Sequence, residues 1–293
     1  MSLTSRFISS CKKTALRPIQ YGSWIKDGNN RNVFGSYADE YDTHRPFYPK
    51  IMWDDIMNDL HDHDDKTAVD MAGGTGRGAL ELARRGFFRS VLAVDLDANM
   101  LARISHAAHR EDLTNLNTIQ SAAEETPLPS HSVDLIVCLQ AFHWFDTIRA
   151  LEEFHRLLKK PNGVAVVAWN DRNLEVDWIQ ELESIIERYN PAYDRKMKIA
   201  EHVVQDGALF EQSGQLKVDS VKRYANPVKN MTNRAMLDLL WTYSYVRNAS
   251  FGSDAETAKQ FNKEIEELLI RHHGEDSAFD LELICKCYIL KPR

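Results

Sequence analysis

A short apolar segment that leads directly into a glycine-rich turn constrains the fold of this chain more than any other feature. Residues 67–72 are predicted to form a strand, and Gly73, Gly74 and Gly76 follow it before a helical stretch that ends at Gly86. Glycines in such a turn let backbone amides approach a ligand, and the N-terminus of the following helix favours negative charge. The turn therefore predicts a ligand-binding site at the end of this strand.

Strands and helices continue to alternate after the turn. Apolar runs predict strands at residues 90–95, 116–120, 133–139 and 164–169, and strand-like segments return at 216–224 and 281–290. This order is typical of a parallel sheet that is covered on both faces. We therefore predict an α/β fold: a Rossmann-like, seven-stranded, mostly parallel sheet with helices on both faces and helical cap insertions.

The chain contains no repeat and no low-complexity linker, so residues 33–293 are predicted to form a single domain. Within it, we assign 33–170 to a cofactor-binding core, 171–215 and 229–275 to the cap insertions, and 216–228 and 276–293 to the completion of the sheet. Residues 1–32 are predicted to be an N-terminal arm or leader.

The composition of the N-terminal segment leaves two interpretations open. The first 26 residues carry five basic side chains and no acidic one, which resembles an organelle transit peptide. The alternative is a flexible arm or a lid over a pocket. We expect a cytoplasmic protein in the second case and a mitochondrial one in the first.

Overall composition excludes several classes of protein. The net charge of -7 argues against nucleic acid as the main partner, and no apolar run approaches the roughly 18 residues of a membrane span. We therefore expect no nucleic acid and no membrane, but a small-molecule substrate and a monomer or homodimer. The four scattered cysteines are expected to be reduced thiols. The His- and Asp-rich residues 61–65 are interpreted as a solvated loop, so no metal is expected.

Two acidic residues indicate the chemistry of the ligand. Glycine spacing alone is ambiguous, because Gly74, Gly76 and Ala79 also satisfy a dinucleotide-binding pattern. Asp70, however, would repel a pyrophosphate, whereas it suits a ligand with an ammonium group. Asp95 ends the next strand, where it can accept hydrogen bonds from a ribose. S-adenosylmethionine has both features, being a zwitterionic amino acid joined to an adenosine.

At these residues the sequence resembles the class I S-adenosylmethionine-dependent methyltransferases, particularly the small-molecule branch that includes trans-aconitate methyltransferase-like proteins. The resemblance covers most of residues 33–170. Residues 70–76 match the family's glycine-rich loop, except that Ala72 stands where a glycine is usual. Residues 123–127 match an element beside the adenine, and 140–145 match a segment that follows a strand.

The resemblance also implies the roles of individual residues, with S-adenosylmethionine as cofactor and S-adenosylhomocysteine as product. The expected cofactor-binding residues are Tyr41, Asp70, Ala72, Gly73, Gly74, Gly76, Asp95, Leu96, Ala123, Glu124 and Gln140. The expected catalytic residues are His143, Trp144 and Arg45. An aromatic helix is expected to contact the substrate through Trp241, Tyr245 and Arg247, although its spacing is equally typical of a core helix.

These features predict methyl transfer to a small molecule, with a carboxylate or hydroxyl oxygen favoured over nitrogen or sulfur. A carboxylate acceptor could be held by Arg45 or Arg247 together with the indole of Trp144. A hydroxyl or amine acceptor could lose its proton to His143. Two alternatives remain: a catalytically silent S-adenosylmethionine-binding regulatory or assembly protein, and a nicotinamide-dependent oxidoreductase.

Overall fold

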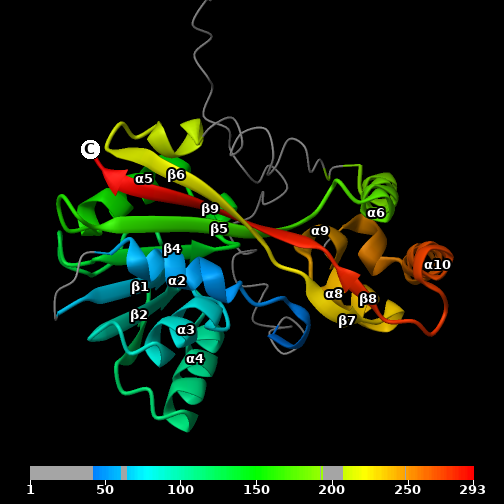
Figure 1. Cartoon of the computed structure of the whole chain (residues 1–293), viewed down its shortest axis with the longest axis horizontal. Helices are drawn as coiled ribbons and strands as arrows, with labels where there is room; N and C mark the ends of the chain where they lie inside the picture. Colours follow the sequence, from blue (N-terminus) through cyan, green and yellow to red (C-terminus); the bar gives the residue numbers. More distant parts are fainter. Residues whose placement is uncertain (1–41, 61–64, 192, 194–206, 248) are drawn as a thin grey trace, which may run out of the picture.

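A seven-stranded sheet with the strand order β3-β2-β1-β4-β5-β9-β6 forms the centre of the computed structural model. The structure describes residues 42–60, 65–191, 193, 207–247 and 249–293 (Figure 1). The expected N-terminal arm or leader, Tyr41 and most of the loop at 61–65 lie outside the described residues. The seven-stranded, mostly parallel α/β fold that the sequence predicts is confirmed.

The first five strands are parallel to one another, and β9 runs antiparallel between β5 and β6. Their bounds are Thr67–Met71 (β1), Ser90–Asp95 (β2), Leu116–Gln120 (β3), Leu135–Leu139 (β4), Val164–Arg172 (β5), Leu216–Ala225 (β6) and Leu283–Pro292 (β9). Strand β4 is almost entirely buried because helices cover both faces of the sheet, which explains its unbroken apolar sequence.

Helices pack on the two faces of the sheet in two hydrophobic cores. One core contains α2 (Lys50–Asn58), α3 (Arg77–Arg84) and α4 (Ala98–Arg110). The other contains α5 (Thr147–Leu157) and the short 3-10 helices η3 (Phe142–Trp144) and η5 (Ala208–Glu211). Aspartates begin two of these helices: Asp97 accepts a hydrogen bond from Asn99 N, and Asp146 accepts one from Arg149 N.

A separate group of helices forms a cap at the end of the sheet where β6 ends and β9 begins (Figure 1). It consists of α6 (Asp177–Tyr189), α8 (Asn233–Trp241), α9 (Ser244–Arg247), η6 (Ser250–Ser253) and α10 (Ala255–His273). These helices, η6 apart, share a third hydrophobic core. Among the described residues, no helix is both long enough and apolar enough to cross a membrane.

The cap also contains a small sheet that differs from the expected boundaries. Strands β7 (Val228–Met231) and β8 (Phe279–Leu281) pair with each other rather than joining the main sheet. Residues 229–231 are therefore strand rather than part of a helical insertion, and residues 279–281 belong to the cap. Phe279 and Leu281 are buried in the core of the cap, which accounts for their position.

Candidate functional site

A cavity of about 870 Å³ lies where the parallel strands β1, β2, β3 and β4 end. This is the edge at which open α/β sheets bind ligands, and β1 and β4 are the neighbours between which the strand order reverses. Eight of the residues predicted from sequence line it: Ala72, Gly74, Asp95, Leu96, Ala123, Glu124, Gln140 and Trp144. Its position at this edge, with a few polar groups from several strand ends in a mostly apolar lining, suits a ligand that contains a nucleoside.

The glycine-rich turn contributes backbone rather than side chains to this cavity. Ala72 and Gly74 adopt left-handed backbone conformations, with φ of 56° and 54°, and both line the cavity. A glycine at position 72 would take this conformation without the steric cost that an alanine carries. Gly76 also has a positive φ, of 95°, and a Cβ there would lie 3.0 Å from Ile104 and 3.2 Å from Leu80.

Asp95 is held in the cavity wall by two backbone amides. Gly74 N donates to one of its carboxylate oxygens at 2.9 Å, and Asp97 N donates to the other at 2.9 Å. Burial raises the pKa of Asp95, although these amides oppose the rise. Because each carboxylate oxygen has two acceptor positions, both oxygens can still accept hydrogen bonds from the hydroxyls of a ribose.

Asp97 was not identified from the sequence as a site residue. It lines the cavity and is 6% exposed. Its Oδ1 caps helix α4, whereas its buried Oδ2 accepts no hydrogen bond from the described residues. A buried carboxylate oxygen in a cavity wall is an acceptor for a ligand donor. The sequence signal for Asp97 was that of a helix cap, which concealed this second capacity.

Asp70 lies beneath the turn rather than in the cavity formed by the described residues. It is 1% exposed, and its Oδ2 accepts a hydrogen bond from Ala79 N at 2.7 Å in the first turn of α3. Burial raises its pKa to about 7. The carboxyl also lies against Gly73 and Gly78, where added Cβ atoms would approach it to 3.2 and 2.6 Å. Asp70 therefore braces the turn, and its direct contact with an ammonium group stays a prediction.

A second, smaller cavity of about 290 Å³ adjoins the first through Gln140, which lines both. Gln140 has a left-handed backbone with φ of 57°, and its side chain donates to the carbonyl oxygen of Asn170 at 3.1 Å. The other lining residues are Arg45, Pro46, Tyr48, Arg77, Asn170 and Tyr243. Two guanidinium groups thus face a space that is otherwise lined by neutral side chains.

Both arginines are oriented by aromatic rings. The guanidinium of Arg45 lies 3.9 Å from the centre of the Tyr243 ring and donates to the carbonyl oxygen of Thr242 at 3.0 Å. That of Arg77 lies 4.1 Å from the centre of the Phe47 ring and 3.5 Å from the exposed carboxylate of Asp42. Sequence reasoning identified Arg45 but missed Arg77 and Tyr243. The position of Arg77 directly after the glycine-rich turn was the available signal.

His143 is half-buried in η3 beside Trp144, at 5.2 Å between ring centres. Its Nδ1 accepts a hydrogen bond from Trp169 Nε1 at 3.4 Å, so the proton of the neutral ring is on Nε2. Burial, with a smaller contribution from the charge of Arg45, lowers the pKa of His143 to about 4. At neutral pH the ring is therefore uncharged. This environment suits a hydrogen-bond donor better than the proton-accepting role expected for a hydroxyl acceptor.

The three residues expected to contact the substrate from the cap are engaged elsewhere or lie outside both cavities. Trp241 donates to Asn262 Oδ1 at 2.8 Å, and the hydroxyl of Tyr245 accepts a hydrogen bond from Arg172 at 2.9 Å. Arg247 is the last residue of α9 and lines neither cavity. The expected continuous helix breaks between α8 and α9, which brings Tyr243 to the smaller cavity instead. Substrate contact by Trp241, Tyr245 and Arg247 stays a prediction.

The described residues contain no group of three or more His, Cys, Asp or Glu side chains that could hold a metal ion. The polar groups of the site are the carboxylates, backbone amides and guanidinium groups described above. They divide it into a larger cavity with carboxylates and backbone amides and a smaller cavity with two guanidinium groups.

Part of the chain is similar to known methyltransferases. Residues 69–167 match a family model described as a methyltransferase domain. An uncharacterized methyltransferase of Mycobacterium bovis is 36% identical over 163 residues, which are 55% of this chain and 62% of the relative. The chain thus spans about three fifths of the length of this relative and of a similar one from Schizosaccharomyces pombe.

Two solved structures share the fold at low sequence identity. A protein of Anaeromyxobacter dehalogenans, provisionally described as a type II methyltransferase, has a TM-score of 0.63 at 22% identity, covering 85% of this chain and 97% of that one. A phosphoethanolamine N-methyltransferase of Haemonchus contortus, in complex with S-adenosylhomocysteine, has a TM-score of 0.51 at 15% identity, covering 90% of this chain and 59% of that one. Residues 69–167 are thus similar to a methyltransferase domain, and the chain shares the fold of these two solved structures.

Proposed function

We propose that this protein transfers a methyl group from S-adenosylmethionine to an oxygen of a small molecule, and that the favoured acceptor is a carboxylate. The observation that carries the proposal is the pair of adjoining cavities with opposite chemistry. The larger one has hydrogen-bond acceptors suited to a nucleoside, and the smaller one has two guanidinium groups suited to an anion.

The residues of the larger cavity fit the cofactor. Asp95 can accept from ribose hydroxyls, and the buried Oδ2 of Asp97 can accept from a further donor such as the adenine amine. The complex of the Haemonchus contortus relative with S-adenosylhomocysteine supports the same cofactor. When bound, S-adenosylmethionine supplies a methyl group on a positively charged sulfur.

The residues of the smaller cavity would align the acceptor. Displacement at a methyl carbon requires the nucleophile to lie in line with the leaving sulfur, so orientation contributes most of the catalysis. Arg45 and Arg77 can bind a carboxylate by charge-assisted hydrogen bonds. A carboxylate is already deprotonated at neutral pH, so no general base is needed. The low pKa of His143 is compatible with this, because a ring that is neutral at physiological pH is not required as a general base for such an acceptor.

Ligand-induced stabilisation tests the cofactor, because a ligand that binds the native state raises the melting temperature. S-adenosylmethionine and S-adenosylhomocysteine are expected to raise it, whereas NADH is expected to leave it unchanged. Stabilisation by NADH alone would refute the proposal in favour of an oxidoreductase.

Transfer of labelled methyl groups from S-adenosylmethionine tests the acceptor class. A panel of small carboxylic acids and their matched alcohols and amines is expected to give carboxyl methyl esters. Incorporation into the amines alone would refute the oxygen acceptor. Binding of the cofactor with no incorporation into an unfractionated metabolite extract would favour the catalytically silent alternative.

A further inference from the structure

One wall of the larger cavity is a loop that carries no regular secondary structure. It follows β3 and contributes Ser121, Ala123 and Glu124 to the lining. Its first part is a tight turn in which Ala122 pairs with Glu125 and the hydroxyl of Ser121 donates to the carbonyl oxygen of Glu125 at 2.7 Å. The turn lies beside Asp95, because Ser121 N donates to the carbonyl oxygen of Asp95 at 3.1 Å. The shape of this loop therefore affects the nucleoside side of the cavity.

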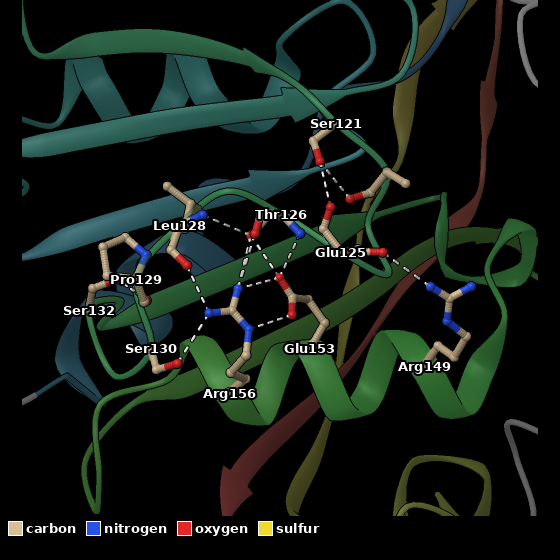
Figure 2. Close-up of polar contacts among 11 residues, drawn as sticks. Ser121, Glu125, Thr126, Leu128, Pro129, Ser130, Ser132, Arg149, Glu153 and Arg156 are labelled. Carbon is tan, nitrogen blue, oxygen red and sulfur yellow. Dashed lines mark hydrogen bonds and ion pairs between the residues drawn. The ribbon is translucent and has the colours of Figure 1, made fainter.

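A buried carboxylate on α5 holds the segment directly after this turn (Figure 2). Glu153 is 6% exposed, and its Oε1 accepts hydrogen bonds from both Thr126 N at 2.8 Å and Thr126 Oγ1 at 2.7 Å. Arg156 donates to Glu153 Oε2 at 2.7 Å and to Oε1 at 2.7 Å. Burial raises the pKa of Glu153, but the hydrogen bonds from Arg156 and Thr126 outweigh it, so the pKa is lowered overall.

The same arginine fixes the rest of the loop. Its guanidinium donates to the carbonyl oxygen of Leu128 at 2.8 Å, to that of Thr126 at 3.2 Å and to Ser130 Oγ at 3.2 Å (Figure 2). One planar guanidinium thus satisfies the carboxylate and three loop acceptors, which a lysine ammonium could not reproduce. A loop without its own helix or strand obtains its conformation from these contacts.

The same helix is also attached to the cavity at its other end. Asp146 N, at the cap of α5, donates to Glu124 Oε1 at 2.9 Å. The segment just before this cap is η3, which carries His143 and Trp144. Helix α5 is thus the common support for the loop on the nucleoside side and for η3 on the other side.

We propose that Glu153 and Arg156 are positioning residues for cofactor binding, which they promote by holding residues 121–130 in the binding conformation. Neither side chain lines the cavity. The inference rests on the proposed cofactor. It means that residues outside the cavity also determine the affinity for that cofactor. Its consequence is that substitutions on a distant face of α5 weaken affinity for the nucleoside end.

The chain offers a closely matched control for this role. Asp134 is also 6% exposed and likewise accepts from a backbone amide, Thr67 N at 2.8 Å, and from a cation, Lys159 at 2.8 Å. It precedes β4 and therefore lies at the end of the sheet opposite the cavity. Glu153→Gln and Asp134→Asn each remove one charge from a buried ion pair while keeping an oxygen for the backbone amide.

The test is calorimetric titration of S-adenosylhomocysteine and of methylthioadenosine, which lacks the amino-acid end, into each variant. For Glu153→Gln, the Kd of both ligands is expected to rise about tenfold. The free energy lost when a buried hydrogen-bond network is disturbed is similar to the free energy that corresponds to a tenfold change in Kd. For Asp134→Asn, the Kd is expected to stay within about twofold of the wild-type value. Amide hydrogen exchange in residues 121–130 is expected to accelerate only in Glu153→Gln.

Arg156→Lys is a second variant, which keeps the positive charge but loses the hydrogen bonds that the guanidinium makes to the loop. It tests the proposal even if Glu153→Gln does not fold. It is expected to raise the Kd of both ligands severalfold. Wild-type affinity in both variants would overturn the inference and leave the proposed cofactor intact, as would an equal loss in Asp134→Asn. Failure of the wild-type protein to bind either ligand would instead refute the proposed cofactor and this role together.

Discussion

Replacing Asp70 with asparagine should change how the stability of the protein depends on pH. Burial raises the pKa of this carboxyl from its ordinary value near 3.8 to about 7. Between these values the folded protein keeps the proton while the unfolded chain releases it, so the free energy of unfolding falls as pH rises from about 4 to about 7. One pKa unit corresponds to about 1.4 kcal/mol, so the fall attributable to Asp70 is roughly 4 kcal/mol.

Urea unfolding of both proteins at pH 4.5, 6 and 8 measures this effect. The amide side chain of the Asp70→Asn variant can still accept the hydrogen bond from Ala79 N but does not ionise. The variant should therefore gain stability relative to the wild type as the pH rises, and most of the gain should be complete by pH 8. A difference between the two proteins that stays constant across these pH values would refute the reasoning.

Asp54→Asn is the control of opposite sign, and it requires the same urea series to be extended to about pH 3. Hydrogen bonds from Arg85 and Lys50 lower the pKa of the Asp54 carboxyl, so this group stabilises the folded protein once it ionises. The wild type should therefore gain stability over Asp54→Asn as the pH rises through the acidic range below about 4. A gain for Asp54→Asn in that range would show that the pH series reports something other than these carboxyls.

Three further predictions concern the site. Asp95→Ala should raise the Kd of S-adenosylhomocysteine, measured by calorimetry, about 10- to 100-fold, because hydrogen bonds to a charged group contribute about 1.5–3 kcal/mol. The circular dichroism spectrum should stay unchanged, and an unchanged Kd would contradict the ribose assignment. Gly78→Ala should lower the free energy of unfolding by about 1–3 kcal/mol in urea, because its Cβ would lie 2.6 Å from the Asp70 carboxylate; a wild-type value would contradict this packing. Because the pKa of His143 is about 4, methyl transfer should show no titration of this group between pH 5.5 and 8; an inflection in that range that disappears in His143→Asn would contradict it.

The cofactor side of the site follows from sequence patterns because its parts are local. Parallel strands bring their carboxyl ends to one edge, so the residues at the ends of β1, β2, β3 and β4 meet there. Asp95 was placed at this edge from its position at the end of a predicted strand, and the family resemblance added Glu124 and Gln140. Their roles as ligand contacts stay predictions, but their convergence on one cavity is observed.

The acceptor side could not be derived in the same way, because its residues come from distant parts of the chain. Arg45 meets Tyr243 across almost 200 positions in the sequence, and no periodicity reports that contact. Tyr243 lies between α8 and α9 and lines the smaller cavity, whereas Tyr245 in α9 does not. Asp70 shows a related limit: its position before the turn was readable, but its burial beneath the turn depends on how closely Gly73 and Gly78 let the backbone pack.

The position of β9 between β5 and β6 has a consequence for biosynthesis. The five parallel strands lie within residues 67–172 and can assemble as soon as that stretch has left the ribosome. In the described structure, β6 obtains its main-sheet pairing from β9, which is synthesised much later. A nascent chain that has emerged only as far as the end of α10 therefore presents β5 and β6 as open edges, the type of surface that promotes aggregation. When β9 emerges, it pairs with both β5 and β6 and ends this period of risk.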